Sequence, residues 1–134
     1  FDALLSRIQH EYRIDPRRIY LVGMSNGGYF AHLIAKERST TIAAVMSHSG
    51  PLGLQTLAGI HAERKFPVMI VHGMDDRIFP HAIARENRDK YVREGHEVKY
   101  IEVPQLGHTW AKDIHINETM WEFFDQHPLP AAGL

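Results

Sequence analysis

The chain has 134 residues, which suits one small domain, and its 44% hydrophobic and 23% charged residues are ordinary for a globular protein. Its 15 basic and 16 acidic residues give a formal net charge of -1, so no basic surplus indicates a nucleic-acid partner. Cysteine is absent, which excludes disulfides, thiolate catalysis and cysteine-ligated zinc, and no apolar run reaches the length of a membrane span.

Helical hydrophobic spacing recurs along the chain. The expected helices are residues 1–12, 25–36, 82–94 and 114–125, with a short one at 54–60 inside a longer connection, 52–65. The residues expected to face inward from helices 25–36 and 114–125 are Phe30, Leu33, Ile34, Ile116, Met120, Trp121 and Phe124. The tail from His127 contains two prolines and is expected to be loosely held.

Four predicted strands alternate with these helices, at residues 18–22, 41–46, 67–71 and 97–103. The second is almost entirely apolar, which is typical of a parallel strand covered on both faces. The fourth alternates apolar and polar residues, which indicates a half-exposed strand nearer an edge. The alternation of helices and strands predicts an α/β fold, in which helices cover both faces of a parallel sheet through right-handed crossovers.

Residues 23–27 read Gly-Met-Ser-Asn-Gly, the G-x-S-x-G pattern of a nucleophile elbow. An elbow holds its serine in a strained backbone conformation, so that the hydroxyl projects above the edge of the sheet. Side chains at positions 23 and 27 are expected to collide there, and Gly28 is expected to let the next helix approach the strand. Because a strand precedes the pattern and a helix follows it, Ser25 is predicted to be a nucleophile rather than part of an inert turn.

Polar side chains follow the ends of all four predicted strands, and ligands of such sheets bind beyond those ends. A serine nucleophile needs a general base within hydrogen-bond reach, and the base needs an orienting acid. In this type of sheet the chain order is serine, acid, histidine, and Ser25, Asp76 and His108 occur in that order. His108 follows the last strand, where a loop can carry its imidazole over the serine.

Other residues compete for several of these roles. Asp75 adjoins Asp76, and neighbouring side chains point in different directions, so one of the two should face the histidine. Glu102 is a poorer candidate, because it lies within the last strand rather than beyond its end. His72 is interpreted as a structural residue bonded to the loop backbone. His48, near the rim, is a candidate substrate contact, and a satisfied turn histidine is the alternative.

A metal site is a second interpretation of the loop after the third strand, since His72, Asp75, Asp76 and His81 are close together in the sequence. Their spacing matches no compact signature such as H-E-x-x-H, so no metal is expected. The chain contains neither G-x-G-x-x-G nor a Walker loop, so nucleotide binding has no support and no cofactor is predicted.

Four stretches together resemble α/β-hydrolases: residues 15–20, residues 23–28, the loop His-Gly-x-x-Asp-x-x-x-Pro at 72–80, and residues 107–110. Within that superfamily the chain is most similar to the polyhydroxybutyrate depolymerase-like and feruloyl-esterase-like carboxylesterases. The resemblance covers about residues 11–126. It implies that Asp76 is the acid and that the backbone N–H of Asn26 is an oxyanion donor.

The family fold has about eight strands, so the resemblance implies that residues 1–134 are one catalytic domain without its N-terminal strands. The second oxyanion donor would lie in the missing half. Strand 18–22 would be an unprotected sheet edge, through which the chain is expected to self-associate. The absence of cysteine departs from secreted depolymerases, so a small ester is expected rather than a polymer, in a cytoplasmic or a secreted protein.

The expected activity is the hydrolysis of small carboxylic esters through an acyl-enzyme, without a nucleic-acid or membrane partner. The residues expected to line the substrate site are His48, Trp110 and the apolar Leu54, Leu57 and Ile60. Two alternatives stay open. One is a serine peptidase of the prolyl-oligopeptidase type, which shares the elbow and the order of the triad. The other is a non-catalytic fragment or binding module on a hydrolase scaffold.

Overall fold

The structure, a computed structural model, describes residues 1–53 and 59–131. Its elements are α1 (Asp2–Glu11), β1 (Tyr20–Met24), α2 (Asn26–Glu37), β2 (Ala44–His48), β3 (Val68–Gly73), α4 (His81–Arg93), β4 (Val98–Val103), the 3-10 turn η1 (Lys112–Ile114) and α5 (Ile116–Asp125). These match the four predicted strands and the four longer predicted helices, with ends that differ by a few residues. The short helix predicted at 54–60 falls mainly on residues 54–58, which lie outside the described ranges.

The four strands form one parallel sheet in the order β1-β2-β3-β4. β2 and β3 are buried along their whole length, whereas β1 and β4 lie at the edges and are only partly covered. This arrangement confirms the predicted α/β class and the half-exposed character of the last strand. Because the strands run in the same direction, their carboxyl ends meet at one rim of the sheet.

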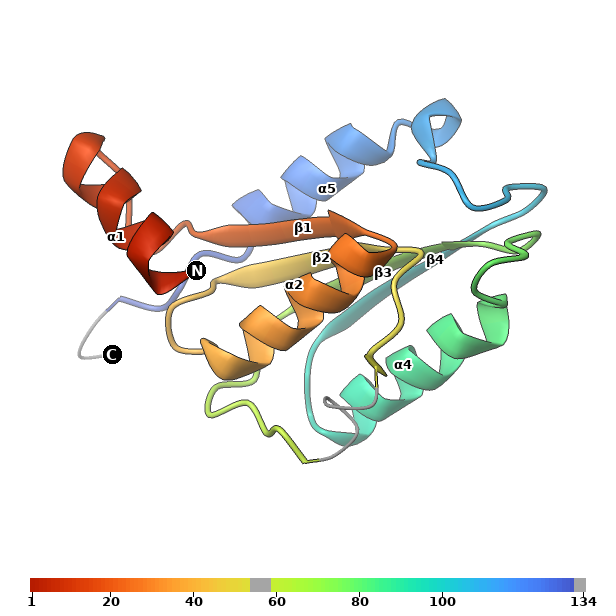
Figure 1. The fold of residues 1–134 in the computed structure, drawn as a ribbon, viewed down its shortest axis with the longest axis horizontal. Helices are drawn as coiled ribbons and strands as arrows, with labels where there is room; N and C mark the ends of the chain where they lie inside the picture. The colour runs from red at the N-terminus through yellow and green to blue at the C-terminus, as the bar shows by residue number, and fades with distance from the viewer. Residues whose placement is uncertain (54–58, 132–134) are drawn as a thin grey trace.

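Helices cover both faces of the sheet. Figure 1 shows α2 and α4 on one face and α5 on the other. On the first face, Ala35 of α2 and Tyr91 of α4 belong to the same buried cluster as Val45 of β2. On the second face, Phe124 of α5 belongs to a cluster with Met46 of β2. The core therefore consists of two apolar layers separated by the sheet.

Two aromatic residues expected in the core are instead exposed. Phe30 is 54% exposed and Trp121 is 59% exposed. The buried residues of α2 include the small Gly28, Ala31 and Ala35, so the helix lies close to the strands and its bulky Phe30 points outward. On α5, Phe123 occupies the inner face where Trp121 was expected.

The tail is more firmly held than expected. The backbone N–H of Leu129 donates to the carbonyl of Arg17 at 2.8 Å, and the guanidinium of Arg17 donates back to the carbonyl of Leu129 at 2.7 Å. The Nδ1–H of His127 also donates to the carbonyl of Phe123 at 2.7 Å. The expectation of a loose tail is therefore wrong as far as Leu129, because backbone pairing ties it to the segment before β1.

The side of the molecule near β1 has little cover. Helix α1 buries none of its residues, and it is joined to the end of α2 by an ion pair between Asp2 and Arg38. Val22 of β1 is 51% exposed. Figure 1 shows α1 beyond the amino end of β1 rather than against either core layer. Within residues 1–53 and 59–131, no helix combines the length and apolar composition that crossing a bilayer requires.

Candidate active site

Ser25 occupies the sharp turn between β1 and α2. Its φ of 56° and ψ of -122° are a strained conformation for a residue with a side chain. A Cβ at Gly23 would lie 2.1 Å from the carbonyl oxygen of Gly27, so a side chain is excluded there. A Cβ at Gly28 would lie 2.6 Å from the Oγ of Ser47, which confirms the close approach of helix and sheet. A Cβ at Gly27 would meet nothing within 4 Å, so the expected collision at that position is wrong.

His108 lies between Ser25 and Asp76. Its Nδ1 is 2.7 Å from the Oδ2 of Asp76, and its Nε2 is 2.9 Å from the Oγ of Ser25. A carboxylate can only accept, so Nδ1 carries the proton and donates it to Asp76. The unprotonated Nε2 is then free to accept the hydroxyl proton of Ser25. The three side chains form one hydrogen-bonded chain, although they come from loops after three different strands.

Asp76 is the carboxylate that faces His108. Its Oδ1 accepts the backbone N–H groups of Ile78 and Phe79 at 2.8 and 2.9 Å. Burial alone would raise the pKa of Asp76, but the hydrogen bonds from His108, Phe79 and Ile78 outweigh it and lower the pKa. Asp75, by contrast, is exposed.

Glu102 is directed elsewhere. Its carboxylate binds the guanidinium of Arg85 and accepts the hydroxyl of Tyr100, on the side of the sheet covered by α4. Its pKa is lowered to about 2, chiefly by the hydrogen bond from Arg85. This carboxylate therefore belongs to a surface ion pair and not to the Ser25–His108 arrangement.

His72 supports the loop that carries Asp76. Its buried Nε2–H donates to the carbonyl of Phe79 at 2.6 Å, which confirms the interpretation of His72 as a structural residue. The same nitrogen lies 3.4 Å from the Oδ2 of Asp76. His81, the first residue of α4, bonds the carbonyl of Met74 instead. In the described part of the chain, no three histidine or carboxylate side chains converge as the ligands of a metal ion.

Asn26, His48 and Trp110 all lie near the Ser25–His108 pair. Asn26 is the first residue of α2, and the first N–H groups of a helix have no partner within the helix. The ring of Trp110 stacks on His48 with centroids 4.8 Å apart, and its indole N–H donates to Asn117. His48 is buried and both of its ring nitrogens bind protein groups, so the ring faces protein rather than an open site. The sequence showed that His48 lies at the end of a strand, but it did not show that its ring accepts the backbone N–H of Ala111, 63 residues later.

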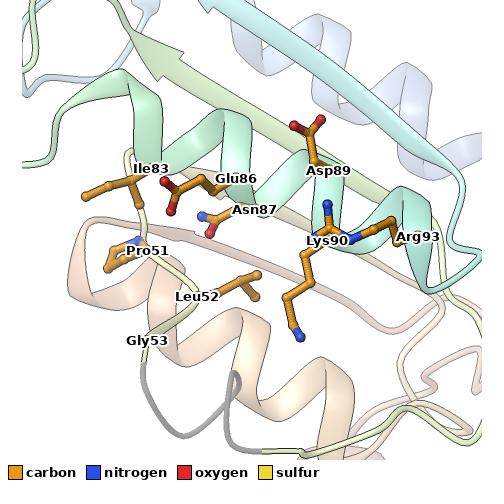
Figure 2. A pocket seen from close by; sticks show the side chains of 9 residues that line it. All are labelled: Pro51, Leu52, Gly53, Ile83, Glu86, Asn87, Asp89, Lys90 and Arg93. Atoms are coloured by element: carbon orange, nitrogen blue, oxygen red, sulfur yellow. The ribbon is translucent and has the colours of Figure 1, made fainter.

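A cavity of about 490 Å³ lies between α4 and the segment that follows β2. Figure 2 shows Pro51, Leu52 and Gly53 on one side of this cavity, and charged residues of α4 such as Glu86 and Arg93 on the other. None of Ser25, Asp76 and His108 lines it. Of the apolar residues expected near the substrate, Ile60 is half-buried, whereas Leu54 and Leu57 lie outside the described residues.

The chain is similar to known esterases in sequence and in structure. The profile of a family described as Phospholipase/Carboxylesterase matches residues 2–123. The bifunctional acetylxylan esterase/xylanase XynS20E of Neocallimastix patriciarum is 33% identical over 75 residues, which are 56% of this chain and 11% of that protein. The solved structure of esterase PE8 is similar with a TM-score of 0.77 at 24% identity, over 91% of this chain and 57% of that one.

A thermostable esterase is similar with a TM-score of 0.80 at 23% identity, over 95% of this chain and 35% of that one. At these identities the two solved structures show a shared fold. The chain thus spans less than two thirds of the length of each of these three proteins.

Proposed function

Because the chain belongs to the phospholipase/carboxylesterase family, we propose that it carries the catalytic triad of a serine esterase, with Ser25 as nucleophile, His108 as general base and Asp76 as orienting acid. The observation that carries the proposal is the pair of hydrogen bonds made by His108, at 2.7 Å to Asp76 and 2.9 Å to Ser25. The strained backbone of Ser25, which is characteristic of a nucleophile elbow, supports it independently.

The mechanism follows from the direction of these hydrogen bonds. His108 Nε2 takes the hydroxyl proton of Ser25 as the oxygen attacks the ester carbonyl, and the backbone N–H of Asn26 donates to the oxyanion. His108 then gives the proton to the leaving alcohol, which leaves an acyl group on Ser25. Water, activated by the same imidazole, releases the acid and restores the serine. Asp76 holds the imidazole tautomer and stabilises its charged form throughout.

Among the α/β-hydrolases, we propose that the chain is most similar to the polyhydroxybutyrate depolymerase-like and feruloyl-esterase-like carboxylesterases. Two motifs support this assignment, Gly-Met-Ser-Asn-Gly-Gly at 23–28 and Gly-His-Thr-Trp at 107–110. The relative from Neocallimastix patriciarum is named for acetylxylan, an ester with a small acyl group. That name is consistent with a small acyl group on the substrate of this chain. The absence of cysteine, which departs from secreted depolymerases, favours a small ester over a polymer. Trp110, beside His108, would form part of the wall of the substrate site.

We also propose that residues 1–134 are the C-terminal part of a longer catalytic domain. Two observations support this: among the described residues no strand pairs with the outer edge of β1, and the chain covers only part of the esterase structures. The upstream part would supply the second oxyanion donor. Loss of one such donor lowers the rate by about a hundred- to a thousand-fold, so we expect this segment to be feeble by itself.

The test is hydrolysis of a short-chain nitrophenyl ester by the full-length protein and by its Ser25→Ala variant. We expect the substitution to lower kcat by at least about a thousand-fold, because it removes the group that forms the acyl-enzyme. Ser6→Ala is the matched control, since Ser6 is an exposed serine on α1 and its loss should leave the rate unchanged. Equal turnover by wild type and Ser25→Ala would refute the proposal.

A fluorophosphonate probe distinguishes the esterase from a non-catalytic binding module. Only a serine activated by a neighbouring base reacts with such a probe. We expect one label per chain, attached to Ser25 and absent from the Ser25→Ala variant. An unlabelled wild-type protein would favour the binding module instead.

A further inference from the structure

We propose that His48 is a positioning residue that sets the distance between Ser25 and His108, and that it is not a substrate contact. This inference rests on the proposed function, because it concerns the same pair of residues. His48 bonds through its backbone to the elbow and through its side chain to the loop of His108.

The backbone of His48 holds the nucleophile. Its carbonyl, at the end of β2, accepts the backbone N–H of Ser25 at 2.9 Å. The next residue, Ser49, in turn donates its N–H to the carbonyl of Val71 in β3 at 2.9 Å. The strained turn of the elbow is therefore attached to the two central strands through residues 48 and 49. A displacement of the His48 backbone would therefore also displace the backbone of Ser25.

The side chain of His48 holds the loop of the general base. Its Nε2 is 3.1 Å from the backbone N of Ala111, three residues after His108. A backbone N–H can only donate, so Nε2 must be unprotonated and Nδ1 must carry the proton. That proton is donated to the Oγ of Ser49, 2.8 Å away. Both ring nitrogens are thus used, and the neutral tautomer is determined by its partners.

Stacking and burial reinforce this attachment. The imidazole of His48 lies against the indole of Trp110, with an interplanar angle of 25°. Burial lowers the pKa of His48 to about 4, and the neighbouring His72 and His108 act in the same direction. The ring is therefore neutral at neutral pH and able to accept the Ala111 N–H.

The loop that carries His108 runs from Leu106 to Ala111, and it contains hydrogen bonds of its own. The N–H of Thr109 donates to the carbonyl of Gly107 at 3.0 Å, and the N–H of Lys112 donates to the carbonyl of Trp110 at 2.9 Å. At its other end, the carbonyl of Leu106 accepts the N–H of Asp75 at 2.9 Å. The loop is thus attached on the Asp76 side through Leu106 and on the Ser25 side through His48. Without the second anchor, His108 would keep Asp76 but lose its fixed distance to Ser25.

The test compares His48→Phe and His48→Gln in the full-length protein. Phenylalanine keeps a flat ring against Trp110 but cannot accept the Ala111 N–H, whereas the amide oxygen of glutamine can. We expect His48→Phe to lower kcat by about a hundred-fold, the effect of a misplacement of about 1 Å, with KM nearly unchanged. His48→Gln should recover a large part of this loss, and it keeps the proposal testable if the phenylalanine variant does not fold.

His96→Phe is the matched control. His96 is also a buried histidine, it donates Nδ1–H to the carbonyl of Phe66 at 2.8 Å, and it packs against aromatic rings. It precedes β4, so it lies at the opposite end of the sheet from the rim that carries Ser25. We expect its substitution to lower the thermal stability as His48→Phe does, but to leave kcat unchanged. Equal values of kcat for wild type and His48→Phe, or equal losses in both phenylalanine variants, would overturn the inference.

Hydrogen exchange of the Nδ1 proton of His108, followed by NMR, tests the geometry without catalysis. The exchange should be faster in His48→Phe than in wild type or His96→Phe, because the loop has lost an anchor. Unchanged exchange would contradict the positioning role. Inactivity of the wild type would refute the proposed function, whereas normal activity with unchanged kcat in His48→Phe would refute the inference alone.

Discussion

At the scale of single residues, the position of one carboxylate decides how the site works. Asp75 and Asp76 are adjacent in the sequence, yet Asp76 alone of the two bonds to His108, and Asp75 is exposed. The lowered pKa of Asp76 keeps its carboxylate ionised at neutral pH. An ionised Asp76 selects the tautomer in which His108 Nε2 can accept the Ser25 proton.

Substitution of each aspartate by asparagine tests this assignment. Asp76→Asn should lower kcat by about ten-thousand-fold, because an amide can hold the imidazole in the wrong tautomer. Asp75→Asn is the matched control and should leave kcat almost unchanged, since its side chain lies in solvent. Steady-state hydrolysis of a nitrophenyl ester measures both variants. A crippling effect of Asp75→Asn combined with a mild effect of Asp76→Asn would reverse the assignment.

At the scale of elements, the elbow depends on its two outer glycines to different degrees. The strand and helix approach so closely that a Cβ at Gly23 would lie inside the contact distance of the backbone at Gly27, whereas a Cβ at Gly27 would meet open space. The pattern G-x-S-x-G treats the two positions alike. The structure shows that the physical restriction acts at the strand end of the turn and not at the helix end.

Alanine substitutions separate the two positions. Gly23→Ala should destabilise the protein by about 3 kcal/mol or more and abolish ester hydrolysis, because the new methyl group overlaps a backbone carbonyl. Gly27→Ala should fold normally, and in the first turn of α2 it should add about 0.5–1 kcal/mol of stability. Urea unfolding and ester hydrolysis measure the two effects. Equal damage by both substitutions would show that the space beside Gly27 is needed for another reason, such as substrate.

At the scale of the whole molecule, the sheet is covered unevenly. One edge strand, β4, carries charged residues such as Lys99 and Glu102. The other, β1, presents backbone groups without a neighbouring strand among the described residues, beside the half-exposed Val22. An open apolar edge of this kind is a template for pairing with another strand. In the longer protein that we propose, upstream strands would occupy it.

The isolated 134-residue chain should therefore self-associate. Val22→Lys should raise the dissociation constant at least about tenfold, equivalent to ~1.4 kcal/mol, because paired edges would bring two charges together. Val92→Lys is the control, since Val92 is equally apolar and 58% exposed but lies on α4. Sedimentation equilibrium over a range of concentrations measures the effect. A chain that stays monomeric at high concentration would show that the edge is not an association surface.

Local pattern alone determined much of this protein. The periodicity of hydrophobic residues predicted the parallel α/β sheet, because a half-buried strand and an amphipathic helix have different repeats. The elbow motif pointed to Ser25. Position after a strand end selected His108, because the carboxyl ends of parallel strands share a rim. The predicted fold class is confirmed, because the helix and strand repeats are local properties of the chain, and Ser25 and His108 do lie within hydrogen-bond distance at that rim.

The tertiary structure decided what depends on packing between distant segments. Phe30 and Trp121 point outward in the structure, which the hydrophobic periodicity did not predict. Periodicity shows which residues share a helix face, but it does not show how closely the helix packs against the sheet. The tertiary structure paired Leu129 with Arg17, and it gave His48 a partner on the His108 loop. The residue types that we propose for the triad were therefore recognisable in the sequence, whereas the distances between them depend on contacts that only the folded chain brings together.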